Sequence, residues 1–525
     1  MTDIRLALSA AVAVVALIVL RALVSRSTSA RNLPPGPPPE SWFTGNRIPS
    51  THPWRTLEKW TRQFGDIYTL RIGSTYLFVL GQASSAHQIM DKQSGSSSDR
   101  PRQIMAGELI SDNRRMLILP YGARWRLFRK VMHETLQDKA AKLYEPIQQH
   151  EATIAMLHLG RTPDRFQQIF KRYAAAVIMQ VTYDYHITSV DDPLIKNVEE
   201  CLSDLAYWIR PGTSLLDRYP PLLFLPTLIN PWKRKGLELR AREQKLFMSQ
   251  WNAVRSRVKT NQCQPCFVSK VQERQHELGI TDAEGSSMAG SLFGAGSDTT
   301  ASGLAIFVMA MCKFPTVLRK LQEEIDGVCG GDRCMPTFAD LSPEQTPYLH
   351  AVVQETLRWR PISAGGFQHK LTQDVEYRGF LLPKGSSVVA PHWSISLDEN
   401  EYPDPHVFRP ERFLQGDEGE VKVKGTWFAA QRGSVAFGFG RRICPGLHIA
   451  MRSLIINLAA MAWCFDIAHP SGNPDNVDDL AFNSAANSHP LPFEAKFTFR
   501  SPAREKVVHD ENRATGEFAR LANQA

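Results

Sequence analysis

The sequence predicts one large, mainly helical domain behind an N-terminal hydrophobic segment. A chain of 525 residues would ordinarily divide into about three or four domains, and its hydrophobic share of 43% is that of a globular protein. Yet proline and glycine are spread throughout, no repeat occurs, and the only serine-rich stretch, 94–98, is too short to be a linker. Helical patterning dominates from about residue 129 to 280, whereas strand-like patterning is confined to short segments.

The segment 1–32 is predicted to be a membrane anchor. The almost unbroken apolar run 6–20 continues past Arg21 to residue 24, just under the roughly 20 residues that a bilayer span requires. More arginines follow the run than precede it, which places the rest of the protein in the cytosol. A cleaved signal peptide is the alternative, but the chain lacks any Asn-x-Ser/Thr acceptor. The proline-rich segment 33–39 is predicted to be a stiff hinge.

Charge and cysteine usage narrow the kinds of partner. The surplus of eight positive charges is mild and forms no block, so we expect no nucleic-acid partner and favour an anionic membrane surface or an acidic protein. The eight cysteines lack the density of a secreted disulfide scaffold. Cys263 with Cys266 and Cys329 with Cys334 leave zinc binding as an alternative, but their irregular spacing favours coincidence.

Several elements follow from the patterning. We predict helices at 54–64 and from 83 to before 94, strands at 67–72 and 76–80, a hairpin at 375–385, and a final strand pair at 493–499 after a turn at 484–488 that touches substrate. The stretch 99–117 is predicted to be an apolar loop that either covers the core or forms a lid over a hydrophobic substrate. The apolar loop 219–226 and the basic residues after it form either a membrane-dipping entrance or a buried connection. The charged tail from 503 is expected to be mobile.

The stretch 286–312 carries a single charge, Asp298. Serines and threonines gather in its middle, where lipid would penalise them, so a long buried helix is predicted in place of a membrane span. Its centre reads Ala295-Gly296-Ser297-Asp298-Thr299-Thr300. A carboxylate beside a hydroxyl can hold and pass protons, although a helix cap at Asp298 is the simpler alternative.

The strongest functional signal surrounds Cys444. The stretch reads Phe437-Gly438-Phe439-Gly440-Arg441-Arg442-Ile443-Cys444-Pro445-Gly446 and precedes the apolar run 447–463. Its glycines permit a tight turn, and the N-terminal amides of the following helix point at the sulfur, which favours a thiolate with a lowered pKa. Because no second ligand stands at chelating spacing, we expect Cys444 to be the single axial ligand of a metal held by a macrocycle. A buried structural cysteine is the alternative.

The pattern Phe-x-x-Gly-x-Arg-x-Cys-x-Gly at 437–446 resembles the haem-binding signature of the cytochromes P-450, the haem-thiolate monooxygenases. The resemblance implies the cytochrome P-450 fold, mainly α with a smaller β region, in which 40–502 is a single large catalytic domain and 503–525 a polar tail. It implies haem b (iron protoporphyrin IX) as cofactor, bound by Phe437, Gly440 and Arg442, with Cys444 as axial ligand.

Three further motifs resemble those of the same family and occur in its order. The resemblance implies that Trp125, Arg129 and His369 bind haem propionates, that Ala295 and Gly296 line the O2 groove, and that Asp298 and Thr299 are the catalytic proton-delivering pair. Gly296 is expected to leave room for O2 beside the iron. Glu355, Arg358 and Arg412 would form a buried network beneath the cysteine loop. Taken alone, each motif has an everyday alternative, such as a surface cation–π pair or a solvated ion pair.

The expected function is insertion of one oxygen atom of O2 into a lipophilic small molecule, by hydroxylation, epoxidation or multi-step oxidation. The chain ends about 80 residues after Cys444 without a flavin or nicotinamide domain, so electrons are expected from a separate NADPH-cytochrome reductase or a cytochrome b-type donor. The sequence looks most like fungal microsomal members of secondary metabolism, which implies a terpenoid, polyketide or indole-type substrate and a single-pass anchor in the endoplasmic reticulum membrane. The alternatives are a redox-neutral haem-thiolate isomerase or dehydratase and a non-catalytic haem sensor.

Overall fold

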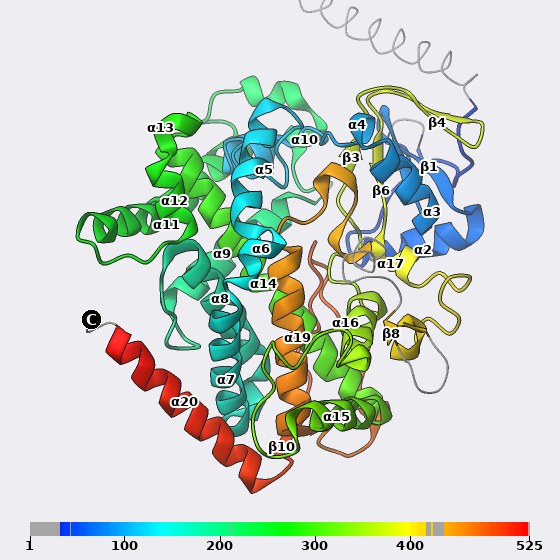
Figure 1. The fold of residues 1–525 in the computed structure, drawn as a ribbon. Coiled ribbons are helices and arrows are strands. Elements are labelled where there is room, and N and C mark those ends of the chain that lie inside the picture. Colours follow the sequence, from blue (N-terminus) through cyan, green and yellow to red (C-terminus); the bar gives the residue numbers. More distant parts are fainter. Residues whose placement is uncertain (1–31, 42–43, 211, 416–421, 424–434, 523–525) are drawn as a thin grey trace, which may run out of the picture.

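The computed structural model describes residues 32–41, 44–210, 212–415, 422–423 and 435–522. The predicted anchor therefore lies outside the described residues, except for residue 32. Figure 1 shows a body of long helices with most of the short strands gathered at one side. This arrangement confirms the expectation of a mainly helical fold with small sheets.

The largest sheet has the strand order β1-β2-β6-β3. β1 (Ile67–Ile72) and β2 (Thr75–Leu80) pair antiparallel, β6 (Ser387–Val389) runs parallel to β2, and β3 (His369–Lys370) closes the edge. The three smaller sheets pair β4 (Val375–Tyr377) with β5 (Phe380–Leu382), β7 (Leu414–Gln415) with β8 (Lys422–Val423), and β9 (Phe465–Ala468) with β10 (Lys496–Phe499). The predicted strands near residue 70 and the hairpin at 375–385 are thus confirmed.

The helices contain many more residues than the strands. In the first half they are α2 (Pro53–Phe64), α3 (Ala83–Ala86), α4 (Ser94–Ser97), α5 (Ala123–Leu136), α6 (Asp138–Lys142), α7 (Glu145–Arg161), α8 (Phe166–Tyr183), α9 (Pro193–Trp208), α10 (Leu215–Arg218) and α11 (Pro231–Lys259). In the second half they are α12 (Phe267–Glu273), α13 (Gln275–Leu278), α14 (Asp282–Lys313), α15 (Pro315–Cys329), α16 (Pro347–Trp359), α17 (His392–Ser396), α19 (Leu447–Cys464) and α20 (Pro502–Ala522). The described residues also contain π-helical turns at His87–Lys92 and Ile104–Ile110.

α14 is the longest of these helices, and its sequence explains both ends. Thr281 accepts a hydrogen bond from the backbone of Glu284, whose carboxylate accepts one from the backbone of Thr281, so a capping box satisfies the first amides. The helix stops at Lys313, two residues before Pro315, because proline disfavours helical geometry in the preceding residue. The predicted buried helix at 286–312 is confirmed, and it lies within α14.

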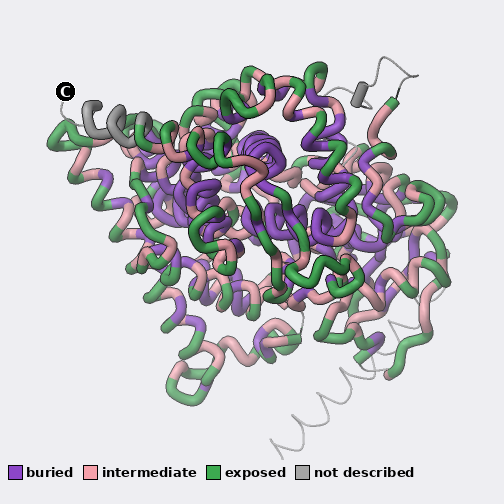
Figure 2. The backbone as a smooth tube through the Cα atoms, turned by 90° about the horizontal axis from the view of Figure 1, so that it is seen from below, coloured by how far each residue is buried: buried purple, intermediate pink, exposed green. Residues whose placement is uncertain are grey.

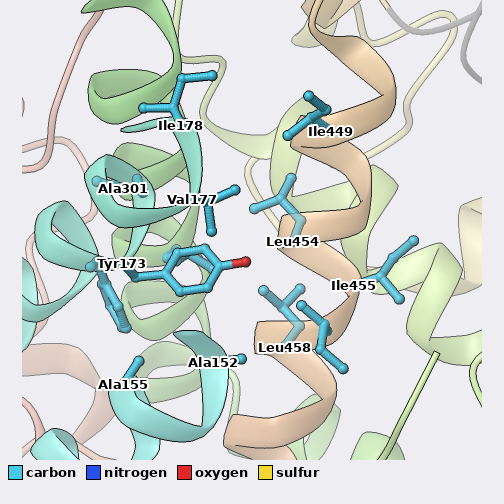
Figure 3. Close-up of a cluster of buried hydrophobic side chains, with 14 of the residues drawn as sticks. Ala152, Ala155, Tyr173, Val177, Ile178, Ala301, Ile449, Leu454, Ile455 and Leu458 are labelled. Atoms are coloured by element: carbon cyan, nitrogen blue, oxygen red, sulfur yellow. The ribbon is translucent and has the colours of Figure 1, made fainter. Parts of the chain in front are cut away.

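The core lies where α8, α14 and α19 meet. Figure 3 shows Tyr173 and Val177 of α8 pointing toward Leu454 and Leu458 of α19. Buried segments gather inside the helical body, with half-buried and exposed segments around them (Figure 2). α19 is long and apolar enough to cross a membrane, yet 89% of that window is buried inside the protein, so this helix is a core element.

Three predicted elements differ from the structure. The predicted loop at 99–117 contains the helical turn Ile104–Ile110, because its apolar side chains are buried against residues of α10 and α11. Of the predicted strand pair at 493–499, β10 is a strand, and its partner is β9, some 30 residues earlier. The tail expected to be mobile forms α20, whose buried Arg504 donates to the Asp332 carboxylate and to the Trp463 carbonyl.

Candidate functional site

The loop before α19 places Cys444 at the start of a buried helix. The Cys444 backbone N–H donates to the Phe437 carbonyl over 2.8 Å, which closes the loop on itself. Gly440 adopts φ 55°, and a Cβ there would come 2.1 Å from the Met90 carbonyl oxygen, so the backbone approach requires glycine. The Gly440 N–H donates to the Asp91 carboxylate, which connects the loop to the π-helical turn His87–Lys92.

The electrostatics of Cys444 correct one expectation. Burial raises the pKa of the thiol above its usual value, and this effect outweighs the opposing effects of the Gly446 backbone N–H and the positive charge of Arg129. The helix start therefore does not by itself produce a thiol with a lowered pKa. The Arg129 guanidinium is half-buried and donates to the Ile443 carbonyl over 2.6 Å, next to the sulfur-bearing residue.

Two arginines, Arg442 of the cysteine loop and Arg100, lie near each other. Arg442 donates to the carbonyls of Ser98, Met116 and Leu119 over 2.8, 3.1 and 2.7 Å. Burial, followed by the charge of Arg442, lowers the pKa of Arg100 to about 9. Arg100 is buried and Arg442 is half-buried, and the charge of the nearby Asp99 partly offsets theirs.

His369 and Trp125 complete this group. The buried His369 ring is fixed by a 2.7 Å hydrogen bond between Nδ1 and the Ser97 carbonyl. Burial and then the charge of Arg100 hold its pKa well below the usual range. Trp125 Nε1 is buried and has no hydrogen-bond partner among the described residues, while the Arg442 guanidinium lies 4.6 Å from the Trp125 ring. An anionic group with acceptor oxygens would satisfy both the charges and the orphaned donor.

The middle of α14 presents two different faces. Ala295 is exposed, whereas the three residues before it are buried and the four after it are half-buried. The Thr299 hydroxyl donates to the Ala295 carbonyl over 2.9 Å. Gly296 instead faces α8, because a Cβ there would come 2.8 Å from the Ile178 side chain. The missing side chain of Gly296 thus allows α8 and α14 to pack closely at this point.

Asp298 is held by residues far along the chain. Its Oδ1 lies 2.9 Å from His489 Nε2, and its Oδ2 accepts from Asn487 Nδ2 over 3.4 Å. Burial alone would raise the pKa of Asp298. The hydrogen bond and charge of His489 and the hydrogen bond from Asn487 together outweigh burial, so the pKa is below its usual value. Asp298 is thus a carboxylate in contact with His489 and Asn487, and it lies inside α14, so no helix begins at it.

The three residues of the expected buried network do come together. Arg358 donates to both Glu355 oxygens over 2.6 and 2.8 Å, and Arg412 Nε lies 3.5 Å from Glu355 Oε1. Glu355 also accepts the backbone N–H of Arg409 over 2.7 Å. Each carboxylate oxygen is therefore bonded, which is what makes a buried charge tolerable.

Comparisons with known proteins identify the family. The family model described as Cytochrome P450 matches residues 34–497. The chain belongs to the cytochrome P450 family. It is 37% identical to cytochrome P450 monooxygenase 64 of Postia placenta over 93% of this chain and 96% of that protein, and 33% identical to cytochrome P450 monooxygenase FrzL of Cladobotryum sp over 91% and 90%. A P450 monooxygenase of Armillaria gallica is 33% identical over 97% of this chain and 98% of that protein.

This P450 is a monooxygenase, and its family uses a haem-thiolate cofactor. The described residues fit such a group. The orphaned Trp125 Nε1, the buried Arg100 and the half-buried Arg442 suit the propionates of such a group. The exposed Ala295 offers a small surface to a flat ring, and the Cys444 sulfur lies just before the start of α19. The donor set is that of an anionic macrocycle with one sulfur ligand.

Sequence reasoning missed two residues of the site. Arg100 lies in the predicted loop 99–117, and an arginine before a proline forms no pattern that predicts burial. His489 was not predicted, since 191 positions separate it from Asp298 in the chain.

Phe437, a predicted site residue, is half-buried beside the core, where its carbonyl accepts from the Cys444 N–H.

Proposed function

We propose that this P450 is an anchored monooxygenase that oxidises a lipophilic small molecule of fungal secondary metabolism. The main support is the position of the Cys444 sulfur just before α19, next to Arg442. The acid–alcohol pair Asp298 and Thr299 on α14 is the second support. The reaction places one atom of O2 in the substrate and releases the other as water, with two electrons and two protons. We assign the electrons to NADPH through a separate cytochrome reductase, with a cytochrome b-type protein as a second donor.

Five residues are proposed to hold the haem. Cys444 is the proposed thiolate ligand, and Trp125, Arg129, His369 and Arg442 hold the propionate side of the cofactor. When bound, the haem supplies the redox chemistry that activates O2.

The roles of the remaining site residues concern protons and shape. Asp298 and Thr299 hold and pass protons at the face where O2 reacts, with Ala295 and Gly296 alongside. Phe437 and Gly440 shape the loop that presents the sulfur. The domain limits that we propose are an anchor at 1–32, a hinge at 33–39, the catalytic domain at 40–502 and a polar C-terminal segment at 503–525.

A lipophilic substrate is supported by the apolar lid. The turn Ile104–Ile110 packs its buried side chains against Leu216 and Leu239, so the lid and the start of α11 form one hydrophobic cluster. Just outside it, Phe224 and Leu228 are 88% and 85% exposed. Exposed apolar side chains followed by a basic helix start are typical of a surface that dips into anionic lipid.

These features support a membrane location and a substrate class. We propose that the segment 219–235 rests on the endoplasmic reticulum membrane and that substrate enters from the lipid. The relatives from fungi named as monooxygenases support secondary metabolism, and we propose a terpenoid, polyketide or indole-type substrate.

The first experiment is the reduced carbon-monoxide difference spectrum of the full chain in microsomes. The wild type is expected to give the red-shifted band of a thiolate-ligated haem, and Cys444→Ala is expected to lose it. Cys334→Ala is the matched control, because Cys334 is an exposed free cysteine. A thiolate band that persists in Cys444→Ala would exclude Cys444 as the ligand.

The second experiment tests the reaction. The microsomal protein, a reductase and NADPH are incubated under labelled O2 with terpenoid, polyketide and indole compounds. One labelled oxygen atom is expected in a product of one of these classes. Conversion without NADPH, or without incorporation of label, would overturn the proposed reaction.

A further inference from the structure

A histidine and an aspartate from another part of the chain contact the cysteine loop. The Asp91 carboxylate accepts the Gly440 N–H at Oδ1, and its Oδ2 contacts His87 Nδ1. His87 and Asp91 lie four residues apart on the π-helical turn His87–Lys92, just before α4. Because a carboxylate accepts hydrogen bonds, the Gly440 backbone and the His87 ring both donate to Asp91. No chemical role assigned above uses either side chain.

The His87 ring also contacts the loop directly. Its centroid lies 5.5 Å from that of the Phe439 ring, and the two rings meet edge to face at 79°. Phe439 is 3% exposed and packs against a second imidazole, that of His392 on α17, at 6.2 Å. Edge-to-face contacts favour one relative orientation of the rings. The loop is therefore held at Phe439 by packing and at Gly440 by a hydrogen bond.

The backbone of the loop fits closely against the same part of the chain. A Cβ at Gly440 would lie 2.1 Å from the Met90 carbonyl oxygen and 2.8 Å from Ser94 Cβ. The turn His87–Lys92 and the start of α4 thus leave the loop no space to shift toward them.

Short-range backbone bonds connect these two points to the sulfur-bearing residue. The Arg442 N–H donates to the Phe439 carbonyl and the Ile443 N–H donates to the Gly440 carbonyl, each over 3.2 Å. The Cys444 N–H then closes the loop through the bond described above. A displacement of Phe439 or Gly440 would therefore be passed to Cys444.

Asp91 depends on His87 for a fixed orientation. The side chains of both residues are 35% exposed, so water competes for the Asp91 carboxylate. With the Gly440 N–H as its one partner, the carboxylate could rotate toward solvent. The bond from His87 holds the second oxygen and keeps the first one on the Gly440 N–H.

We propose that His87 and Asp91 are positioning residues that hold the loop from Phe439 to Cys444 and thereby keep the sulfur bound to the haem iron. The proposal rests on the proposed function, because it concerns haem ligation by Cys444. Asp91 acts through the Gly440 N–H, and His87 acts through Asp91. Neither residue is assigned a contact with the cofactor.

The test compares Asp91→Leu with Lys92→Leu in the full chain. Both changes place leucine at a charged position of the same turn, but Asp91 bonds to the loop whereas Lys92 is exposed. The half-life of the thiolate-type carbon-monoxide band is measured in urea below the unfolding transition. We expect Asp91→Leu to shorten it about tenfold, as the loss of a hydrogen bond to a charged group implies, and Lys92→Leu to leave it unchanged. Asp91→Asn keeps an acceptor oxygen for the Gly440 N–H and is expected to restore most of the half-life.

His87→Phe tests the second member of the pair. Phenylalanine keeps a ring against Phe439 but removes the donor to Asp91, so the half-life should fall less, by about threefold. In the Asp91→Leu background, His87→Phe is expected to have no further effect, because His87 acts through Asp91.

A second readout separates positioning from stability. Electron paramagnetic resonance of the frozen ferric protein reports the geometry of the axial ligands while the protein is folded. We expect the g values of Asp91→Leu to differ from those of the wild type and the g values of Lys92→Leu to match them. If Asp91→Leu retains no haem, His87→Phe takes its place in both measurements, because it leaves Asp91 available to Gly440.

The outcomes separate this proposal from the proposed function. A wild type without a thiolate-type band would overturn the proposed function. A wild type with this band and an Asp91→Leu variant of equal half-life and g values would overturn the positioning role alone. A lower melting temperature in Asp91→Leu with unchanged g values would show a merely structural contact and would also overturn it. A full effect of His87→Phe in the Asp91→Leu background would overturn the action of His87 through Asp91.

Discussion

The Arg442 guanidinium lies 4.6 Å from the centroid of the Trp125 ring, so the cysteine loop and α5 meet through a cation–π contact. Arg442 also donates to three backbone carbonyls, which fixes its side chain in place. Two residues predicted from separate motifs to bind the same cofactor thus support each other directly.

Replacing Arg442 is expected to cost cofactor. Arg442→Met leaves three carbonyls without their donor, at about 1–3 kcal/mol for each that stays buried, and removes a cation from the cluster. We expect the haem-to-protein ratio of the purified variant to fall by more than half. The control is Arg441→Met, because Arg441 is exposed and donates to the Tyr121 hydroxyl. Equal haem content in the two variants would contradict the role given to Arg442.

Gly440 and Gly438 offer a matched test of the cysteine loop. Both have positive φ, 55° and 76°, but a Cβ at Gly440 would lie 2.1 Å from the Met90 carbonyl oxygen, whereas one at Gly438 meets nothing within 4 Å. Gly438→Ala should therefore cost only the backbone strain, on the order of 1 kcal/mol. Gly440→Ala adds a clash with the backbone and is expected to lose haem and to unfold at a markedly lower temperature. Similar melting temperatures for the two variants would show that the loop can move away.

Thr299→Ala tests the proton role of the hydroxyl. The variant loses one hydrogen bond to the Ala295 carbonyl, so haem binding should be retained. We expect reducing equivalents to be diverted to hydrogen peroxide, measured as peroxide formed per NADPH consumed. Ser291→Ala is the control, because Ser291 makes the same type of bond to the Ser287 carbonyl on the same helix. An unchanged peroxide yield in Thr299→Ala would exclude the assigned role.

Local patterns predicted the motif residues and several elements, and distant contacts account for the rest. The Cys444 loop, the Glu355–Arg358 pair and the strands near residue 70 each depend on close neighbours in sequence, so their spacing was informative. The turn at 104–110 was predicted to be a loop because its helical form depends on burial against α10 and α11. Likewise, the partner of β10 and the partner of Asp298 come from other parts of the chain, which a single sequence does not pair.

The same limit applies to roles inside a recognised motif. The resemblance implies space for O2 at Gly296. The structure shows that the Ile178 side chain lies opposite Gly296, and this contact depends on how α8 packs on α14, which the sequence does not reveal. The thiol of Cys444 was expected to have a lowered pKa from its helix start, but the extent of burial decided the direction.

Because of His392, the folded protein is expected to lose stability in mild acid. The ring is buried, its Nδ1 has no hydrogen-bond partner in the described part of the chain, and it packs against Phe439. Burial lowers the pKa of His392 to about 4, below the value near 6.5 expected in the unfolded chain. As the pH falls below about 6.5, the unfolded chain binds a proton that the folded protein does not, so stability present above that pH is lost progressively down to about pH 4.

The measurement is the urea midpoint of the haem-loaded protein at pH 7.5 and pH 5. From the shift at His392 alone, the free energy of unfolding should fall by about 2 kcal/mol between these two values. His392→Phe keeps a ring against Phe439 and removes the titration, so its loss between the two pH values should be smaller than that of the wild type by this amount. His276→Phe is the control, because His276 is exposed on α13 and should leave the pH dependence unchanged. A pH dependence in His392→Phe equal to that of the wild type would show that folding does not lower the pKa of His392.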